Sequence, residues 1–285
     1  MKGMEKIPYP GLMAREEKRL KEHIKYMDLI LEVLDARLPV TSRNYRLQKM
    51  LGDKKRLIVL NKADLAEEEI TGRWLEVLAG EKWPVLAFNA RNASGLEKLE
   101  KLLLINRPVN LRYRRPLRLM VVGIPNVGKS TIINRLVHKL AVKTGQRAGI
   151  TRGLQWIRLR AGWELLDTPG LLSPHIKNDE SALSLAAIGS IDLKVVGEER
   201  AAKWLLGKYL ARGKSSFLIT HYAVSDDYDG KSAADLLVDI GVSRRCYKKG
   251  GEVDTMKAAQ LVLTDFRRGA LGRISLEEPG DYEKQ

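Results

Sequence analysis

Cysteine is nearly absent from this sequence, since Cys246 is the single one in 285 residues. One cysteine can form neither an internal disulfide nor a cysteine-rich zinc site. Long apolar runs are missing as well, because none approaches the eighteen or so residues that a membrane-spanning helix needs. The amino terminus, MKGMEKIPYPG, has neither an apolar stretch nor a small-residue cleavage site. The sequence therefore predicts a cytoplasmic protein with no membrane segment and no secretion signal.

Acidic residues are missing from one long stretch of the chain. Residues 101–163 hold 14 Lys and Arg side chains and no Asp or Glu. The net charge of +15 belongs to the first part of the chain, since residues 1–175 hold 33 basic and 18 acidic residues whereas residues 176–285 hold 17 of each. Such a charge favours a polyanionic partner, and nucleic acid is the first candidate.

Four mostly apolar runs in the first half predict buried parallel strands. Helical stretches near 45–51, 67–79 and 95–103 follow the first three runs, so strands and helices alternate as in a doubly wound sheet. Residues 153–167 predict a hairpin of two further strands. We expect an α/β fold with a doubly wound, mostly parallel sheet whose ligand sites lie at the carboxyl ends of the strands. The four runs are Leu29–Asp35, Arg56–Leu60, Pro84–Phe88 and Leu117–Val122.

The second half of the chain has a different character. From about Asn178 onward the sequence predicts helical segments joined by Gly- and Asp-rich turns, near 181–190, 198–211, 233–239 and 255–268. We therefore divide the chain into an α/β domain, residues 1–175, and a small all-α domain, residues 176–285.

A phosphate-binding pattern lies between the fourth apolar run and a predicted helix. GIPNVGKS, Gly123–Ser130, matches G-x-x-x-x-G-K-[ST] in this strand-to-helix setting. Its glycines let backbone N–H groups face phosphates, Lys129 would reach the outer phosphates, and Ser130 would ligate magnesium. The predicted phosphate-binding residues are Asn126, Val127, Gly128, Lys129, Ser130 and Thr131.

Two further elements are typical of magnesium-dependent nucleotide hydrolases. DTPG ends the predicted strand WELLD, so Asp167 would hold magnesium through water and the Gly170 N–H would sense the terminal phosphate. Thr151 lies between the phosphate loop and DTPG, and it would contact both magnesium and the terminal phosphate. The predicted magnesium ligands are therefore Ser130, Thr151 and Asp167.

Guanine recognition is indicated by NKAD, which follows the second apolar run. Asp64 would accept two hydrogen bonds from base N–H groups that adenine does not offer, which disfavours an ATPase. Asn61 would tie this loop to the phosphate loop, and the stem of Lys62 would pack on the base. Asn89 and Ala90, after the third run, would present a backbone N–H to the guanine oxygen. These residues predict GTP and GDP as ligands.

The order of the motifs is the reverse of that in ordinary GTPases, because the guanine loop at Asn61 precedes the phosphate loop at Gly123. A parallel sheet permits this order, since all these loops project from one edge and a different chain connection leaves the site intact. The sequence therefore predicts a circularly permuted P-loop GTPase domain. The chain leaves DTPG for the helical domain, so the nucleotide state would bias the position of that domain.

The permuted order, the stretch LDARLPVTSRN (Leu34–Asn44) and the late stretch KKGGEVDTMKAAQLVLTDFRRGALGRISLE (Lys248–Glu277) resemble the ribosome biogenesis GTPase A family, and the resemblance runs nearly end to end. It implies a GTPase that joins a late precursor of the large ribosomal subunit, contacts RNA through its helical domain and leaves after hydrolysis. Leu171 follows DTPG where many GTPases place a water-orienting glutamine, and the family has an apolar residue there. Leu12 stands where the family has a histidine, so no role of that histidine carries over.

Asn126 resembles the asparagine of potassium-activated members of this GTPase class, which helps to hold a monovalent cation near the phosphates. K⁺ in that place would substitute for an arginine finger. The predicted catalytic group is therefore Lys129, Thr151, Gly170 and Asn126.

Other functions stay open on the residues alone. Since no side chain is an evident water-positioning base, an RNA-binding assembly factor is one alternative, with GTP as a structural ligand and incidental hydrolysis. The permuted GTPases that serve the small subunit are another. That resemblance would require an amino-terminal nucleic-acid-binding barrel and a zinc-binding cysteine cluster, whereas about 28 residues precede the first predicted strand. We expect a monomer.

Two basic patches are predicted to contact rRNA, with a solvated basic face as the alternative. Because the Thr151 segment would be ordered by GTP and magnesium, the first patch would be placed correctly only in that state, which makes RNA affinity depend on the nucleotide. The first patch comprises Arg112, Arg114, Arg115 and residues 143–152, and the second comprises Arg244, Arg245, Lys248 and Lys249.

Overall fold

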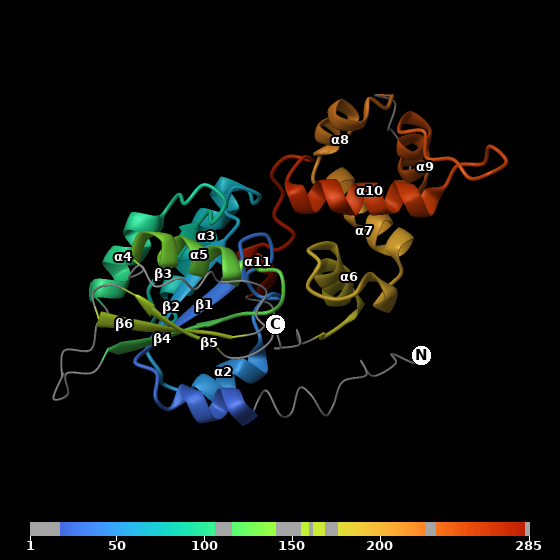
Figure 1. Ribbon diagram of the computed structural model, residues 1–285. Helices are drawn as coiled ribbons and strands as arrows, with labels where there is room; N and C mark the ends of the chain where they lie inside the picture. The colour runs from blue at the N-terminus through green and yellow to red at the C-terminus, as the bar shows by residue number, and fades with distance from the viewer. Residues whose placement is uncertain are drawn as a thin grey trace.

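The computed structural model describes residues 18–105, 116–140, 155–159, 162–168, 176–225 and 232–282. Its centre is a six-stranded sheet with the order β3-β2-β1-β4-β6-β5 (Figure 1). Neighbouring strands are parallel except β5 and β6, which form an antiparallel hairpin. The predicted α/β class with a mostly parallel sheet is confirmed. The strands are β1 (Leu29–Asp35), β2 (Arg56–Asn61), β3 (Val85–Phe88), β4 (Leu117–Val122), β5 (Gln155–Leu159) and β6 (Trp163–Asp167).

Helices cover both faces of this sheet. Every residue of the central strand β1 is buried, and its side chains alternate, so that Leu31 packs on one face while Ile30 and Leu34 pack on the other. Helices α4 (Leu96–Ile105) and α5 (Lys129–Leu140) cover the first face. Residues 18–24, α2 (Tyr45–Leu51) and α3 (Glu68–Ala79) cover the second. Burial on both faces explains why the strands are continuous apolar runs.

The carboxyl-terminal half is helical. Helix α10 packs against α6, α7 and α9 (Figure 1). The sequence does not predict α8, because its eight residues have only a weak amphipathic period. No helix among the described residues is both long and apolar enough to cross a membrane. The helices are α6 (Asp179–Ala187), α7 (Glu198–Ala211), α8 (Ser215–Tyr222), α9 (Ala233–Ser243) and α10 (Thr255–Arg268), with the 3-10 turn η2 (Leu193–Val195).

After α10 the chain returns to the α/β domain. Residues 274–278, named here the return segment, lie along the loops at the edge of the sheet. The Ile274 N–H donates to the Leu65 carbonyl at 3.0 Å, and the Leu276 N–H donates to the Arg37 carbonyl at 2.9 Å. The short helix α11 (Pro279–Tyr282) then packs against α3. The predicted division of the chain does not anticipate this return, because a short extended segment has no period that indicates what it contacts.

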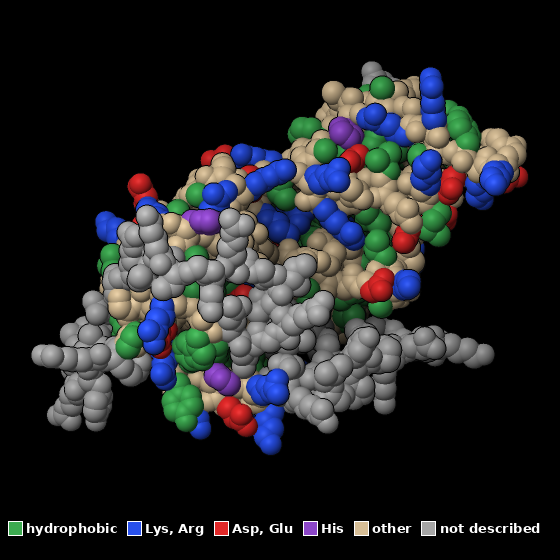
Figure 2. Space-filling model, viewed as in Figure 1, with side chains coloured by type: hydrophobic (Ala, Val, Ile, Leu, Met, Phe, Trp, Pro, Cys, Tyr) green, Lys and Arg blue, Asp and Glu red, His purple; other side chains and the backbone are tan. Residues whose placement is uncertain are grey.

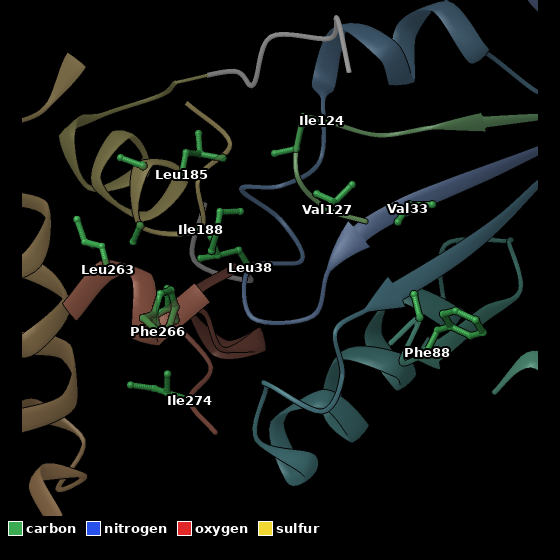
Figure 3. Close-up of a cluster of buried hydrophobic side chains, with 14 of the residues drawn as sticks. Val33, Leu38, Phe88, Ile124, Val127, Leu185, Ile188, Leu263, Phe266 and Ile274 are labelled. Carbon is green, nitrogen blue, oxygen red and sulfur yellow. The ribbon is translucent and has the colours of Figure 1, made fainter. Parts of the chain in front are cut away.

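One hydrophobic core joins the two halves. Ile124 and Val127 of the phosphate loop belong to the same buried cluster as Leu38 and as Ile188 and Phe266 of the helical half. Figure 3 shows these five side chains around the junction between the phosphate loop, the loop after β1 and the ends of α6 and α10. The phosphate loop therefore rests partly on the carboxyl-terminal half.

Candidate nucleotide-binding site

The predicted nucleotide motifs meet at one edge of the sheet. The phosphate loop, Gly123–Ser130, follows β4, the guanine loop, Asn61–Asp64, begins at the end of β2, and Asp167 ends β6. Strands β2, β1, β4 and β6 are adjacent and parallel. Their carboxyl ends therefore lie together, although the motifs are in reversed order along the chain.

The phosphate loop is folded tightly around its lysine. Gly128 has a φ of 99°, and a Cβ atom there would lie 2.1 Å from Nδ2 of Asn61, so a side chain would collide. The buried amine of Lys129 donates to the carbonyls of Gly123 and Ile124, at 2.9 and 2.8 Å. Both acceptors belong to the loop itself, which encloses the amine at the amino-terminal end of α5.

Burial changes the chemistry of this lysine. It lowers the pKa of Lys129 to about 8, while the negative charge of Asp167 acts in the opposite direction. Two carbonyls supply only partial negative charge to the ammonium group. An anion such as a phosphate would therefore be stabilised here by the lysine and by the amino terminus of α5. The residues present fit a bound phosphate chain.

Asn61 joins three loops. Its Nδ2 donates to the Val127 carbonyl at 2.7 Å, so it ties the guanine loop to the phosphate loop. Its Oδ1 accepts the N–H of Ala90 at 3.1 Å, which ties both to the loop after β3. This Ala90 N–H is the group predicted to reach the guanine oxygen, and here it is directed at Asn61. Its contact with a base stays a prediction, as does that of Asn89, whose Oδ1 accepts the N–H of Arg91.

Lys62 is held between strand ends. Its amine donates to the Asn126 carbonyl at 2.6 Å and lies 3.0 Å from Oδ2 of Asp35. Burial lowers the pKa of Lys62, and the carboxylate of Asp35 opposes this effect. Two residues later, the half-buried Asp64 occupies the turn between β2 and α3. The lysine of the guanine loop is thus placed beside the phosphate loop.

The predicted magnesium ligands are only partly described. Ser130 and Thr131 are exposed in the first turn of α5, and Asp167 is buried at the end of β6. The hydroxyl of Thr168 donates to the Val121 carbonyl at 2.6 Å and holds the end of β6 against β4. The other predicted residues, Thr151, Gly170, Leu171 and Leu12, lie outside the described residues.

The carboxyl-terminal half contributes groups that the motifs do not predict. Nδ2 of Asn126 donates to the Gly189 carbonyl at 2.5 Å, and the hydroxyl of Ser190 donates to the Pro125 carbonyl at 2.7 Å. A cavity of about 430 Å³ opens at this junction. No local sequence pattern indicates these contacts, because their partners are 63 and 65 residues apart. The cavity is lined by Lys62, Asn126, Ile188, Gly189, Ile191, Asp192, Leu193, Glu198 and Arg267.

Several cations of the acid-free stretch serve the fold. Arg118 pairs with Glu164 at 3.5 Å, and Lys139 pairs with Glu100 at 2.8 Å. The Nε of Arg135 donates to the Ala90 carbonyl at 3.0 Å. These cations therefore have partners within the protein. The first predicted RNA patch, with Arg112, Arg114, Arg115 and residues 143–152, lies outside the described residues.

The second predicted RNA patch lies at the projecting end of the helical half, where Figure 2 shows Lys and Arg side chains. Its members have different surroundings. The guanidinium of Arg244 donates to the His221 carbonyl and lies 5.3 Å from the ring centre of Tyr222. Arg245, Lys248 and Lys249 are exposed, and no carboxylate in the described part of the chain pairs with them.

Comparison with known proteins finds relatives along nearly the whole chain. The family model described as 50S ribosome-binding GTPase matches residues 118–219. Over 284 residues the chain is 34% identical to Ribosome biogenesis GTPase A of Bacillus cereus, and the alignment covers 97% of this chain and 95% of that protein. Over 273 residues it is 31% identical to Ribosome biogenesis GTPase A of Thermotoga maritima, and the alignment covers 96% of this chain and 94% of that protein.

Solved structures are similar as well. GDP-bound YlqF of T. maritima has a TM-score of 0.66 and 29% identity, over 92% of this chain and all of that one. GNP-bound YlqF from T. maritima has a TM-score of 0.65 and 28% identity, over 93% of this chain and 98% of that one.

Proposed function

This chain belongs to the ribosome biogenesis GTPase A family, and from this premise we propose that it binds and hydrolyses GTP in late assembly of the large ribosomal subunit. One observation carries the proposal. The amine of Lys129 lies within the phosphate loop, and the amine of Lys62 and the amide of Asn61 reach the same loop from the end of β2. A site of this kind suits a nucleotide with both a phosphate chain and a base.

Each group has a role in the proposal. Lys129 holds the outer phosphates, Lys62 packs on the base, and Asp64 accepts its two N–H groups. Magnesium, when bound, supplies positive charge against the phosphates, and Ser130, Thr151 and Asp167 would hold it. The exposed Ser130 and the buried Asp167 carboxylate offer the oxygen donors that this cation prefers.

K⁺ binding at Asn126 is a further part of the proposal. The Nδ2 atom of Asn126 is directed at Gly189, so its amide oxygen is the end that a cation would use. Leu171 cannot orient a water molecule, and Leu12 replaces the family's histidine. We therefore expect slow hydrolysis by the isolated protein and faster hydrolysis on the ribosomal particle, with Gly170 and Thr151 sensing the terminal phosphate.

The proposed partner is a precursor of the large subunit, contacted through rRNA in the GTP state. Arg245, Lys248 and Lys249 support this part, because they are exposed and pair with no carboxylate among the described residues, as suits contact with a phosphate backbone. Arg244 has a structural role in addition, since it binds His221. A cytoplasmic location and a monomeric state belong to the same proposal.

Single-turnover GTP hydrolysis, with and without purified large-subunit particles, tests this function. We expect acceleration by large subunits, none by small subunits, and no hydrolysis of ATP. An unaccelerated rate together with nucleotide-independent binding to RNA would favour the alternative, an assembly factor with GTP as a structural ligand. Acceleration by small subunits would favour the small-subunit type.

A further inference from the structure

Asp35 is a buried carboxylate with two cationic partners. It ends β1 and is fully buried, as is Arg37 two residues later. Nε and Nη2 of Arg37 donate to the two carboxylate oxygens at 2.9 and 2.8 Å, and the amine of Lys62 lies 3.0 Å from Oδ2. Burial alone would raise the pKa of Asp35, but the charges of Arg37 and Lys62 hold it well below its ordinary value. The group is therefore a charged cluster of one anion and two cations.

Arg37 also contacts the carboxyl-terminal half. Its guanidinium carbon lies 4.6 Å from the ring centre of Phe266, and its Nη1 donates to the Phe266 carbonyl at 3.4 Å. The Arg37 carbonyl accepts the N–H of Leu276 from the return segment. Arg37 thus lies between the guanine loop and the last turn of α10.

These contacts link Lys62 to Asp35, Asp35 to Arg37, and Arg37 to Phe266. A bidentate arginine–carboxylate pair fixes the plane of the carboxylate, whereas a single ammonium group does not. With the plane fixed, Oδ2 of Asp35 faces Lys62, whose backbone has a φ of 59° and whose long side chain has many other rotamers. Without the pair, Lys62 would lose its orientation toward Asn126.

We propose that Arg37 is a positioning residue for nucleotide binding: through Asp35 it orients Lys62, and through Phe266 it makes that orientation depend on the docking of α10. The inference rests on the proposed guanine site. In this role Arg37 acts through Asp35 and Lys62 and needs no contact with the nucleotide itself. Gly269 supports the proposal, because a Cβ atom there would lie 2.4 Å from Cδ2 of Leu65, so the end of α10 contacts the residue that directly follows the guanine loop.

The same helix begins near the exposed cations. α10 starts at Thr255, directly after the Tyr247–Val253 bridge that carries Lys248 and Lys249, and it ends beside Arg37. A helix is a stiff connection between these two places. A shift of α10 caused by a partner at its first end would reach Lys62 through Phe266 and Arg37.

A double-mutant cycle on the full chain tests the proposal, with fluorescent GDP as the probe. Arg37→Met and Lys62→Met should each weaken binding about tenfold, and the double variant should be no weaker than either single one. Arg43→Met is the matched control. Arg43 belongs to the same loop and pairs with Glu32 and Glu81 rather than with Asp35, so its removal should leave GDP affinity unchanged.

Phe266→Leu is a milder second variant that tests the same coupling if Arg37→Met does not fold. It keeps the apolar packing and removes only the ring. We expect it to weaken GDP binding two- to threefold in the wild type, by about the size of one lost cation–ring contact, and to have no effect in the Lys62→Met background. Additive losses in either cycle would overturn the inference. If the wild type binds ATP as well as GTP, the proposed function fails instead, so the two failures are distinct.

Discussion

The two lysines of the nucleotide site are held in opposite ways. Lys129 is enclosed by carbonyls of its own loop, those of Gly123 and Ile124. Lys62 is held by Asp35 from another strand and by the carbonyl of Asn126, and its carboxylate partner is in turn fixed by Arg37. The lysine of the phosphate side is therefore held locally, whereas the lysine of the base side depends on the carboxyl-terminal half.

This difference separates two kinds of sensitivity. A change at Lys129 should affect phosphate binding without disturbing the junction of the two halves. A change near Lys62 should affect both the base side and the junction, because the return segment binds the chain just after the guanine loop. There Ser275 and Glu67 exchange two hydrogen bonds at 2.9 and 3.1 Å. Binding of a partner to the helical half should act on the base side through Lys62, and on the phosphate loop through its contacts with Gly189 and Ser190.

Removal of the phosphate-side lysine should have the largest effect. Lys129→Ala should lower single-turnover GTP hydrolysis at least about a hundredfold, because Lys129 is the one lysine within the sequence of the phosphate loop. Its thermal unfolding should change little, since only loop carbonyls lose a partner. Lys139→Ala on the same helix, which loses an ion pair with Glu100, should retain full activity. Equal activity of both variants would contradict the local account of the phosphate side.

A change on the base side should alter which nucleotide the protein prefers. Asp64→Asn should weaken GTP binding about a hundredfold and strengthen binding of xanthosine triphosphate, because the amide offers a donor where guanine also has one. Competition against fluorescent GDP measures both changes. Asp53→Asn, at an exposed carboxylate paired with Lys82, is the control and should leave the preference intact. A loss of GTP without a gain of the xanthosine nucleotide would refute the role of Asp64.

The pKa of Lys129 predicts a pH dependence on the phosphate side. The ammonium form binds phosphate, and its fraction falls as the pH rises through about 8. GDP affinity should therefore fall about tenfold between pH 7 and pH 9. Unfolding does not explain such a loss, because a lysine pKa lowered by folding makes stability rise with pH in this range. Guanosine, which lacks phosphates, should bind with little change over the same range.

The smallest effect concerns the projecting end of the helical half. Lys248→Ala combined with Lys249→Ala should reduce the salt dependence of RNA binding by about two phosphate contacts, with unchanged stability. Arg244→Ala should instead destabilise the fold by about 1 kcal/mol, because it loses contacts with Tyr222 and His221. Filter binding across salt concentrations and thermal melts separate the two. A stability loss in the lysine variant would show that these cations serve the fold.

Local features of the fold were predictable from the sequence, and long-range partners were not. The run Leu29–Asp35 matches β1 in both bounds, because a strand buried on both faces is apolar throughout. The phosphate loop was recognisable because its chemistry needs adjacent residues. No local pattern indicates a role for Arg37, since its partner Phe266 is 229 residues away. Helix periodicity likewise carried no sign of the return segment.

Ala90 and Arg244 show the same limit. The Ala90 N–H was predictable as a loop donor, but which acceptor it meets depends on Asn61 from another strand. Arg244 was predicted as an RNA contact from charge alone, and its contact with Tyr222 depends on how α8 packs. Charge and motif identify candidate groups, whereas packing decides which partners they have.

Affinity for purified large-subunit precursor particles, measured by sedimentation in a nonhydrolysable GTP analogue and in GDP, tests the central claim most directly. The account predicts at least about tenfold tighter binding with the analogue, because the nucleotide and the particle act on the same junction. Small subunits should not bind in either state. Equal affinity in the two nucleotides, or equal binding to small subunits, would contradict the account.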